Sequence, residues 1–312
     1  MNASPAAPLD QATPTPSRPL ASGFDIRLAR RKFANGAMWF FAILFTVLAI
    51  IPLVLVLFHL LRNGLPNLNL DFFTKIQPAP GEKTGGGMNH SIIGTLMMIG
   101  IAMCIGLPFG LFGGIYLAEF GQNRFGGLVR FAADVLNGIP SIVIGIFVYT
   151  VAVLPATKAT EGRVTFSAWA GGLALGIMMV PTIMRTTEEI VRLVPMSMRE
   201  AALALGSTRW LAVFKVVLNA AKGGIITGIL LAIARISGET APLLFTALSN
   251  NFRNTNPSQP TAALPTTIYS FASSPDNHWI DLAWTGSLVL VSMILILSIA
   301  ARYFTQGRGR KM

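Results

Sequence analysis

Long apolar segments separated by short polar ones dominate the hydrophobic pattern of this chain. A helix needs about 20 apolar residues to cross a hydrocarbon core about 30 Å thick. Six segments approach or exceed that length: 38–61, 92–117, 136–154, 166–184, 224–248 and 282–301. They are too long and too continuously apolar for barrel strands, in which lipid-facing and lumen-facing residues alternate. The pattern therefore predicts an all-α membrane protein with six transmembrane helices.

Composition agrees with this prediction, because 53% hydrophobic residues, 12% charged residues and a mean hydropathy of +0.60 exclude a soluble globular protein. Five prolines lie within the first 23 residues, so we expect residues 1–36 to be a flexible tail. The apolar run that follows is too long for a cleavable signal peptide. We expect a transmembrane domain over 37–305 and a basic tail over 306–312.

The net charge of +11 has a topological explanation. When the successive loops and the two tails are assigned to alternate sides of the six spans, seventeen Lys and Arg residues fall on one side of the membrane and six on the other. Because cytoplasmic loops carry the excess of basic residues, we expect both termini and the 185–222 loop to lie inside the cell. No soluble module presents a basic face with interleaved aromatic residues, so we expect no nucleic-acid partner.

Metal-site and catalytic chemistry are not indicated. Cys104 is the single cysteine, and His59, His90 and His278 are scattered without ligand spacing. The segment 81–84 resembles a fragment of a nucleotide-binding loop, but no strand leads into it. We predict no catalytic residue, no metal and no cofactor in this chain. Energy for uphill transport would then come from a partner or an ion.

Arg235 and Glu239 are the ionisable residues at the end of the fifth apolar segment. Charges in a membrane segment are costly and usually face a cavity, a partner or a solute path. A guanidinium group suits an oxyanion, so we expect Arg235 to line a substrate path, with Ser237 and Thr240 as neutral donors. We expect Glu239 to neutralise Arg235 at i+4 when the path is empty. A purely structural ion pair is the alternative.

The third apolar segment contains Pro140 and Ser141. Proline removes a backbone donor, so we expect a broken or kinked helix there, with Ser141 satisfying a freed carbonyl. Such breaks are often structural, but they also line solute paths in transporters.

Small residues at four-residue spacing predict close helix packing, either within one subunit or at a seam with a second subunit. They are Gly106, Gly110, Gly114, Gly172, Gly176, Gly224 and Gly228.

The loop between the fourth and fifth spans predicts two short helices. Ser197 and Glu200 have the spacing of a capping box that begins the first helix. Gly206 suits a left-handed stop, and Ser207 or Thr208 can cap the second helix. Two helices joined by a tight turn would then protrude into the cytoplasm.

This loop resembles the EAA loop of bacterial ABC importer permeases. The residues that carry the resemblance are Glu200, Ala201, Ala202, Gly206, Val216 and Leu218, with Asn219 where that family usually has proline. The resemblance implies a type I ABC importer permease fold, in which the loop is a coupling helix that docks on an ATPase subunit. Small side chains at 201 and 202 would allow close docking.

The segment 235–247 resembles the permease subunits of phosphate-specific importers, and 138–143 and 264–269 agree. The likeness covers about residues 36–305. It implies a bilayer-embedded heterodimer with a second permease subunit and transport by alternating access in a bacterial or archaeal cytoplasmic membrane. It also implies two ATPase subunits that bind ATP and Mg, and an extracytoplasmic phosphate-binding protein.

Other classes stay open. A permease for another oxyanion, such as sulfate or molybdate, would share the coupling loop. A secondary transporter or channel would need no ATPase and would show inverted repeats between its halves, which we do not find. An intramembrane enzyme would need a nucleophile and base, or paired metal ligands, on facing spans.

Overall fold

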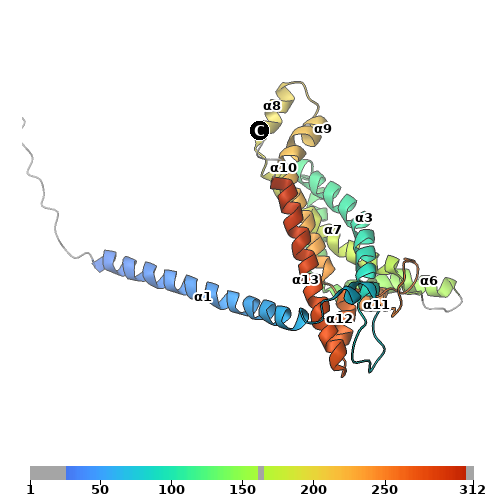
Figure 1. The fold of residues 1–312 in the computed structure, drawn as a ribbon. Coiled ribbons are helices and arrows are strands. Elements are labelled where there is room, and N and C mark those ends of the chain that lie inside the picture. Colours follow the sequence, from blue (N-terminus) through green and yellow to red (C-terminus); the bar gives the residue numbers. More distant parts are fainter. Residues whose placement is uncertain (1–25, 161–164, 307–312) are drawn as a thin grey trace, which may run out of the picture. The chain divides into compact units, whose positions relative to one another are not determined.

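The computed structural model describes residues 26–160 and 165–306, in two units, 1–56 and 57–312, each considered by itself. The described residues form helices, turns and loops and contain no strand. Figure 1 shows the ribbon. The helices are α1 (Ile26–Gly64), α2 (Leu70–Thr74), α3 (Asn89–Glu119), α4 (Arg124–Gly138), α5 (Ser141–Val148), α6 (Leu154–Ala159), α7 (Ala168–Arg192), α8 (Met196–Ala204), α9 (Arg209–Ala212), α10 (Leu218–Ser237), α11 (Ala241–Thr246), α12 (Leu264–Ala272) and α13 (Asn277–Gln306), with π-helical turns at Tyr149–Val153 and Val213–Val217.

Six helical segments in the described part of the chain are long and apolar enough to cross a membrane, which confirms the predicted number. Two predicted positions are wrong. The third span begins at Ser141 rather than 136, because the chain breaks at Pro140, which has no N–H to continue the helix. The fifth span covers Arg209–Ser237 rather than 224–248, because α10 ends before Gly238 and α11 is too short to cross.

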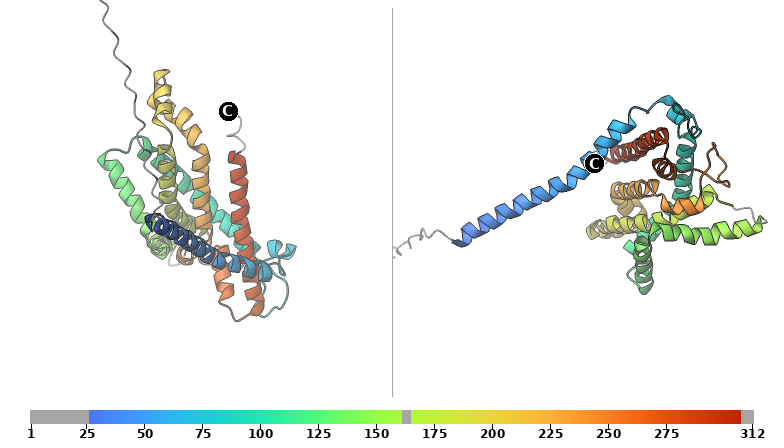
Figure 2. Two further views of the ribbon diagram at one scale, coloured as in Figure 1. Left: turned by 90° about the vertical axis from the view of Figure 1, so that its left-hand side faces the viewer. Right: turned by 90° about the horizontal axis from the view of Figure 1, so that it is seen from below.

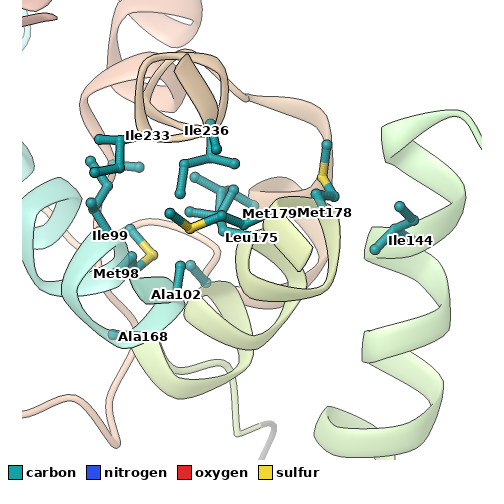
Figure 3. Close-up of a cluster of buried hydrophobic side chains, with 14 of the residues drawn as sticks. Met98, Ile99, Ala102, Ile144, Ala168, Leu175, Met178, Met179, Ile233 and Ile236 are labelled. Atoms are coloured by element: carbon teal, nitrogen blue, oxygen red, sulfur yellow. The ribbon is translucent and has the colours of Figure 1, made fainter. Parts of the chain in front are cut away.

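The core of the bundle lies between α3, α7 and α10, which run side by side in both Figure 1 and Figure 2. Buried apolar side chains from the three helices converge there (Figure 3). They include Met98 and Ile99 of α3, Leu175 and Met179 of α7, and Ile233 and Ile236 of α10. Without a hydrophobic driving force in lipid, this close packing holds the helices together.

The glycine row of α3 faces α7. A Cβ atom on Gly106 would lie 2.8 Å from the Met179 Sδ, and one on Gly110 would lie 2.7 Å from the Ile183 Cβ. The α3 and α7 backbones therefore approach more closely than larger residues would allow. The prediction of close packing within one subunit is confirmed for this row.

Gly114→Ala is expected to destabilise the protein. The new Cβ would lie 2.6 Å from the Met184 carbonyl oxygen, a backbone atom that cannot turn away. Overpacking of this kind costs roughly 1–3 kcal/mol. Gly100→Ala is the matched control, because Gly100 lies on the same helix with no atom within 4 Å of its Cβ position. Thermal unfolding in detergent should show a lower midpoint for Gly114→Ala only, and equal midpoints would contradict the packing.

At one end of the bundle α8 and α9 project beyond α3 and α10, as Figure 1 shows; we call this the α8 end. Gly206 has φ +82° and ends α8, as predicted. Its N–H donates to the Leu203 carbonyl (2.9 Å), and the Ser207 N–H donates to the Ala202 carbonyl (3.1 Å). These two bonds form a Schellman motif.

The helix start was predicted less well. α8 begins at Met196 with Pro195 at the N-cap, so Ser197 lies inside the first turn and caps nothing; the predicted capping box is wrong. Proline, with φ −57°, already sets the entry geometry. Thr208 does cap α9, since its Oγ1 accepts from the Leu211 N–H (3.4 Å). The second helix is not short, because α9 continues through a π-helical turn into α10.

At the N-terminal side, α1 begins at Ile26, so the last part of the predicted tail, residues 26–36, is helical. Residues 1–25 and the 307–312 part of the predicted basic tail lie outside the described residues.

At the opposite end of the bundle, Asp276 closes the loop that leads into α13. Its carboxylate accepts the Gly81 N–H (3.0 Å) and the His278 N–H (2.9 Å). The hydrogen bond from the Gly81 N–H is the largest cause of the lowering of the pKa of Asp276 below its ordinary value. The loop contact is therefore present at neutral pH and is lost as the pH falls through this lowered pKa.

Candidate functional site

Two helix breaks lie opposite each other within the bundle. One separates α4 from α5 at Pro140, and the other separates α10 from α11 at residues 238–240. On one side of the breaks Arg235 contacts Asn137, and on the other a Cβ on Gly145 would lie 2.6 Å from the Pro242 Cα. The two broken segments therefore run alongside each other.

Arg235 extends from the last turn of α10 toward α4 and α7. Its Nη1 donates to the Thr182 Oγ1 (3.2 Å) and, at longer range, to the Asn137 Oδ1 (3.5 Å). The Thr182 hydroxyl lies 3.4 Å from the same Asn137 oxygen. Both partners are neutral, and the Arg235 side chain is exposed. Its positive charge therefore has no counterion within 4.0 Å in the described part of the chain.

This cation lies near the middle of the bundle. Thr182 is fourteen residues after Ala168 and ten before Arg192, the first and last residues of α7. At 1.5 Å per residue, these separations are about 21 and 15 Å. Arg235, in the last turn of α10, therefore lies beside the middle of α7.

We expected Glu239 to neutralise Arg235 at i+4, but it does not. α10 ends at Ser237, so the two residues do not belong to one helix, and among the described residues the Glu239 carboxylate makes no ion pair or hydrogen bond. The predicted internal pair is absent because Gly238 ends the helical spacing on which it depended. Glu239 is half-buried at the break itself.

The neutral residues of the prediction divide into two groups. Thr240 is half-buried at the start of α11, beside the break. Ser237 is buried, and its hydroxyl donates to the Ile233 carbonyl of its own helix (2.7 Å). It lines an apolar groove of about 740 Å³ between α3, α10 and α13. Two residues along a helix are about 200° apart, so Ser237 and Arg235 occupy different faces of α10.

The predicted break at Pro140 is confirmed, with an exposed proline at the N-cap of α5. Ser141 is the first residue of α5 and is half-buried, but its hydroxyl accepts and donates no hydrogen bond among the described residues. The expectation that it satisfies a freed carbonyl is therefore wrong. The first turn of α5 has no side-chain cap, and of its backbone N–H groups that of Val143 donates to the Pro140 carbonyl (2.9 Å).

A second polar cluster lies between Arg235 and the α8 end, and sequence reasoning missed it. Glu188 of α7 is 2% exposed and pairs with Arg130 of α4 (2.6 Å), Arg192 (2.7 Å) and Arg185 (3.5 Å). Arg185 also pairs with Asp134 (2.5 Å). The signal was present as polar residues at helical spacing on α4 and α7. The fourth span was predicted to end at 184, whereas α7 continues to Arg192 and carries these polar residues as a helix.

Of the EAA-like residues, Glu200, Ala201, Ala202 and Gly206 lie on α8 and the turn that follows, and Val216 and Leu218 lie where the π-helical turn meets α10. Glu200 and Ala201 are exposed, whereas Ala202 is 7% exposed and faces its own chain. Leu205, at the turn, is 88% exposed. Between α8, α9 and the end of α3 lies a cavity of about 460 Å³ with Glu200 at its edge. The chain therefore offers an apolar tip at Leu205 and Gly206 beside a cavity with charged and apolar lining residues.

Among the described residues no group of three or more His, Cys, Asp or Glu side chains could hold a metal ion.

Residues 106–310 match the model of a family described as binding-protein-dependent transport system inner membrane component. The chain belongs to this family. As a member with six apolar helices, the permease is a multi-pass inner-membrane protein.

Relatives with known names are similar over most of their length. The phosphate transport system permease protein PstA of Haemophilus influenzae is 43% identical over 285 residues, 91% of this chain and 98% of the relative. PstA of Yersinia pestis is 46% identical over 80% of this chain and 82% of the relative. A probable PstA of Methanocaldococcus jannaschii is 37% identical over 83% and 89%. Within the family, the permease is therefore grouped with the PstA proteins.

Solved structures agree on the fold. A bacterial alginate ABC transporter in complex with an alginate pentasaccharide-bound periplasmic protein matches with a TM-score of 0.59 and 13% identity, over 91% of this chain and 98% of that one. An inward-facing MetNI methionine ABC transporter matches with a TM-score of 0.54 and 20% identity, over 70% and 92%. The predicted all-α fold of ABC importer permeases is confirmed.

Proposed function

We propose that the permease is one of two membrane subunits of an ATP-driven importer that moves inorganic phosphate into the cytoplasm by alternating access. The observation that carries the proposal is Arg235, a cation that has no counterion among the described residues and lies beside the middle of α7, between two helix breaks. The names of the relatives, which are phosphate transport system permeases, support the choice of anion.

The chemistry around Arg235 suits a passing oxyanion. A guanidinium remains charged and presents several donors in a fixed geometry to phosphate oxygens. Its present partners, Asn137 and Thr182, are neutral, so an anion can replace them without separating an ion pair. The uncapped first turn of α5 begins at the opposing break, and helix N-termini favour negative charge. Glu239, at the second break, would repel the anion onward once it has left Arg235.

The orientation and the partners follow from charge and exposure. The basic side of the protein includes α8 and α9, so we place the α8 end and both termini in the cytoplasm. An ATPase subunit that binds ATP and Mg docks at the exposed α8–α9 turn. A second, similar permease subunit and a second ATPase complete the membrane assembly. A phosphate-binding protein delivers the anion on the outer side.

Uptake in cells deleted for other phosphate importers tests the proposal. Cells that produce this permease with the products of its neighbouring genes should accumulate labelled phosphate. Excess unlabelled phosphate should abolish that signal, and equal concentrations of sulfate or molybdate should leave it unchanged. Inhibition by sulfate or molybdate to the same extent would instead assign the permease to another oxyanion. Uptake that persists when the ATPase gene is deleted would identify a secondary transporter.

A further inference from the structure

Arg199 of α8 points into the protein and ties three helices together. Its guanidinium donates to the Glu119 carboxylate, the last residue of α3, through Nε (3.0 Å) and Nη2 (2.7 Å). It also donates to the carbonyls of Val194 (2.5 Å) and Val191 (2.9 Å), where α7 ends. Arg199 is 16% exposed and Glu119 is 12% exposed. The arginine therefore joins α8 to the ends of both α3 and α7.

Each group that Arg199 contacts is a hydrogen-bond acceptor at or near a helix end. Glu119 lies at the C-terminus of α3, the negative end of the helix dipole, where a carboxylate is unfavourable by itself. The Val191 and Val194 carbonyls lie in and beyond the last turn of α7, where backbone acceptors lack partners within the helix, although the Val191 carbonyl also accepts the Val194 N–H (3.3 Å). Only an arginine carries enough donors in one plane to serve all three groups.

The rest of α8 is attached weakly to the bundle. α8 is described in full, and Ala202 is its single buried residue. A methyl group offers little contact area, so the hydrogen bonds of Arg199 add an inward attachment to the packing of α8 against α9 and the turn Val213–Val217. Glu200, the next residue, is exposed and lies at the edge of the cavity that Arg199 also lines.

The helices that Arg199 contacts are connected in turn to the residues around Arg235. α3 and α7 are joined by the close glycine contacts described above, so they form one closely packed body. Arg130 of α4 donates to the Leu117 carbonyl of α3 (2.8 Å) and to Glu188 of α7 (2.6 Å), which adds α4 to that body. α7 and α4 carry Thr182 and Asn137, the two residues that contact Arg235.

We propose that Arg199 is a positioning residue through which movement of α8 reaches the helices that hold the partners of Arg235. The inference rests on the proposed function, since it assumes that an ATPase moves α8. Loss of Arg199 would leave the exposed docking surface in place and cut its connection to the site. Transport and ATP hydrolysis would then become uncoupled.

The test compares Arg199→Ala and Glu119→Ala with wild type in the complete transporter, purified and reconstituted in lipid vesicles with its binding protein. Phosphate entry and ATP hydrolysis are measured on the same vesicles. For both variants we expect at least a fivefold rise in ATP hydrolysed per phosphate transported, with the ATPase still copurifying in normal amount. Arg199→Lys, which can keep the Glu119 pair but cannot serve both α7 carbonyls, should give an intermediate ratio. A merely structural role would lower both rates together and leave the ratio unchanged.

Arg124→Ala is the matched control. Arg124 is an exposed arginine at the same end of the bundle, in the first turn of α4, with no ion pair among the described residues. Its replacement should leave the ratio at the wild-type value. If Arg199→Ala cannot be purified, Arg199→Lys and Glu119→Ala decide by the same ratio.

A wild-type ratio in the Arg199 and Glu119 variants would overturn the inference while leaving phosphate transport intact. Wild-type vesicles that import no phosphate would instead overturn the proposed function. The two failures are therefore distinguishable in one experiment.

Discussion

Arg235→Ala is expected to reduce labelled phosphate uptake by about a hundredfold while the transporter still assembles. Hydrogen bonds to a charged group contribute about 1.5–3 kcal/mol, and 2.8 kcal/mol corresponds to about a hundredfold. Assembly should survive because Arg235 is exposed and its partners are neutral, so its removal leaves no buried carboxylate unpaired. Uptake is measured in cells without other phosphate importers, and assembly by copurification of the ATPase.

Glu188 shows why this separation between transport and assembly is informative. Glu188 is buried among three arginines, and breaking such a buried pair typically costs about 3–5 kcal/mol. A substitution in that cluster would lower uptake through misfolding as well as through any role in transport, whereas a substitution at Arg235 separates the two effects. Arg253→Ala, in an exposed loop, is the matched control for loss of one positive charge. Normal uptake by Arg235→Ala in an assembled transporter would remove Arg235 from the mechanism.

Gly206→Val is expected to abolish uptake and release the ATPase from the complex. Gly206 has φ +82°, and a residue with a Cβ in this left-handed region costs about 1–2 kcal/mol, more when it is β-branched. No atom lies within 4 Å of the Cβ position, so the whole effect comes from the backbone and not from a clash. Relaxation of the turn would break the two Schellman hydrogen bonds and displace Leu205. Copurification of the ATPase and phosphate uptake measure the outcome.

Gly223→Val is the control, since Gly223 in α10 also has open space around its Cβ position but no positive φ. Gly206→Asn should retain most of the activity, because asparagine tolerates the left-handed region. A fully active Gly206→Val protein with bound ATPase would show that the turn is not the docking element.

Local features of the fold could be predicted from the sequence. The six spans follow from segment length, the break at Pro140 from the missing N–H, and the left-handed turn at Gly206 from the missing Cβ. Each depends on covalent geometry or on hydropathy over one stretch of chain. The predicted capping box at Ser197 was wrong for a reason that is also local, because Pro195 is the N-cap residue of α8.

The site itself was decided by tertiary structure. Arg235 was found in the sequence, but its partners lie 98 and 53 residues away, on helices that meet only after the bundle packs. The expected pair with Glu239 assumed an unbroken helix, and α10 ends between them. Glu119 and Arg199 are 80 residues apart, and neither stood out alone. Long-range polar contacts of this kind depend on how helices approach, which small residues permit but do not orient.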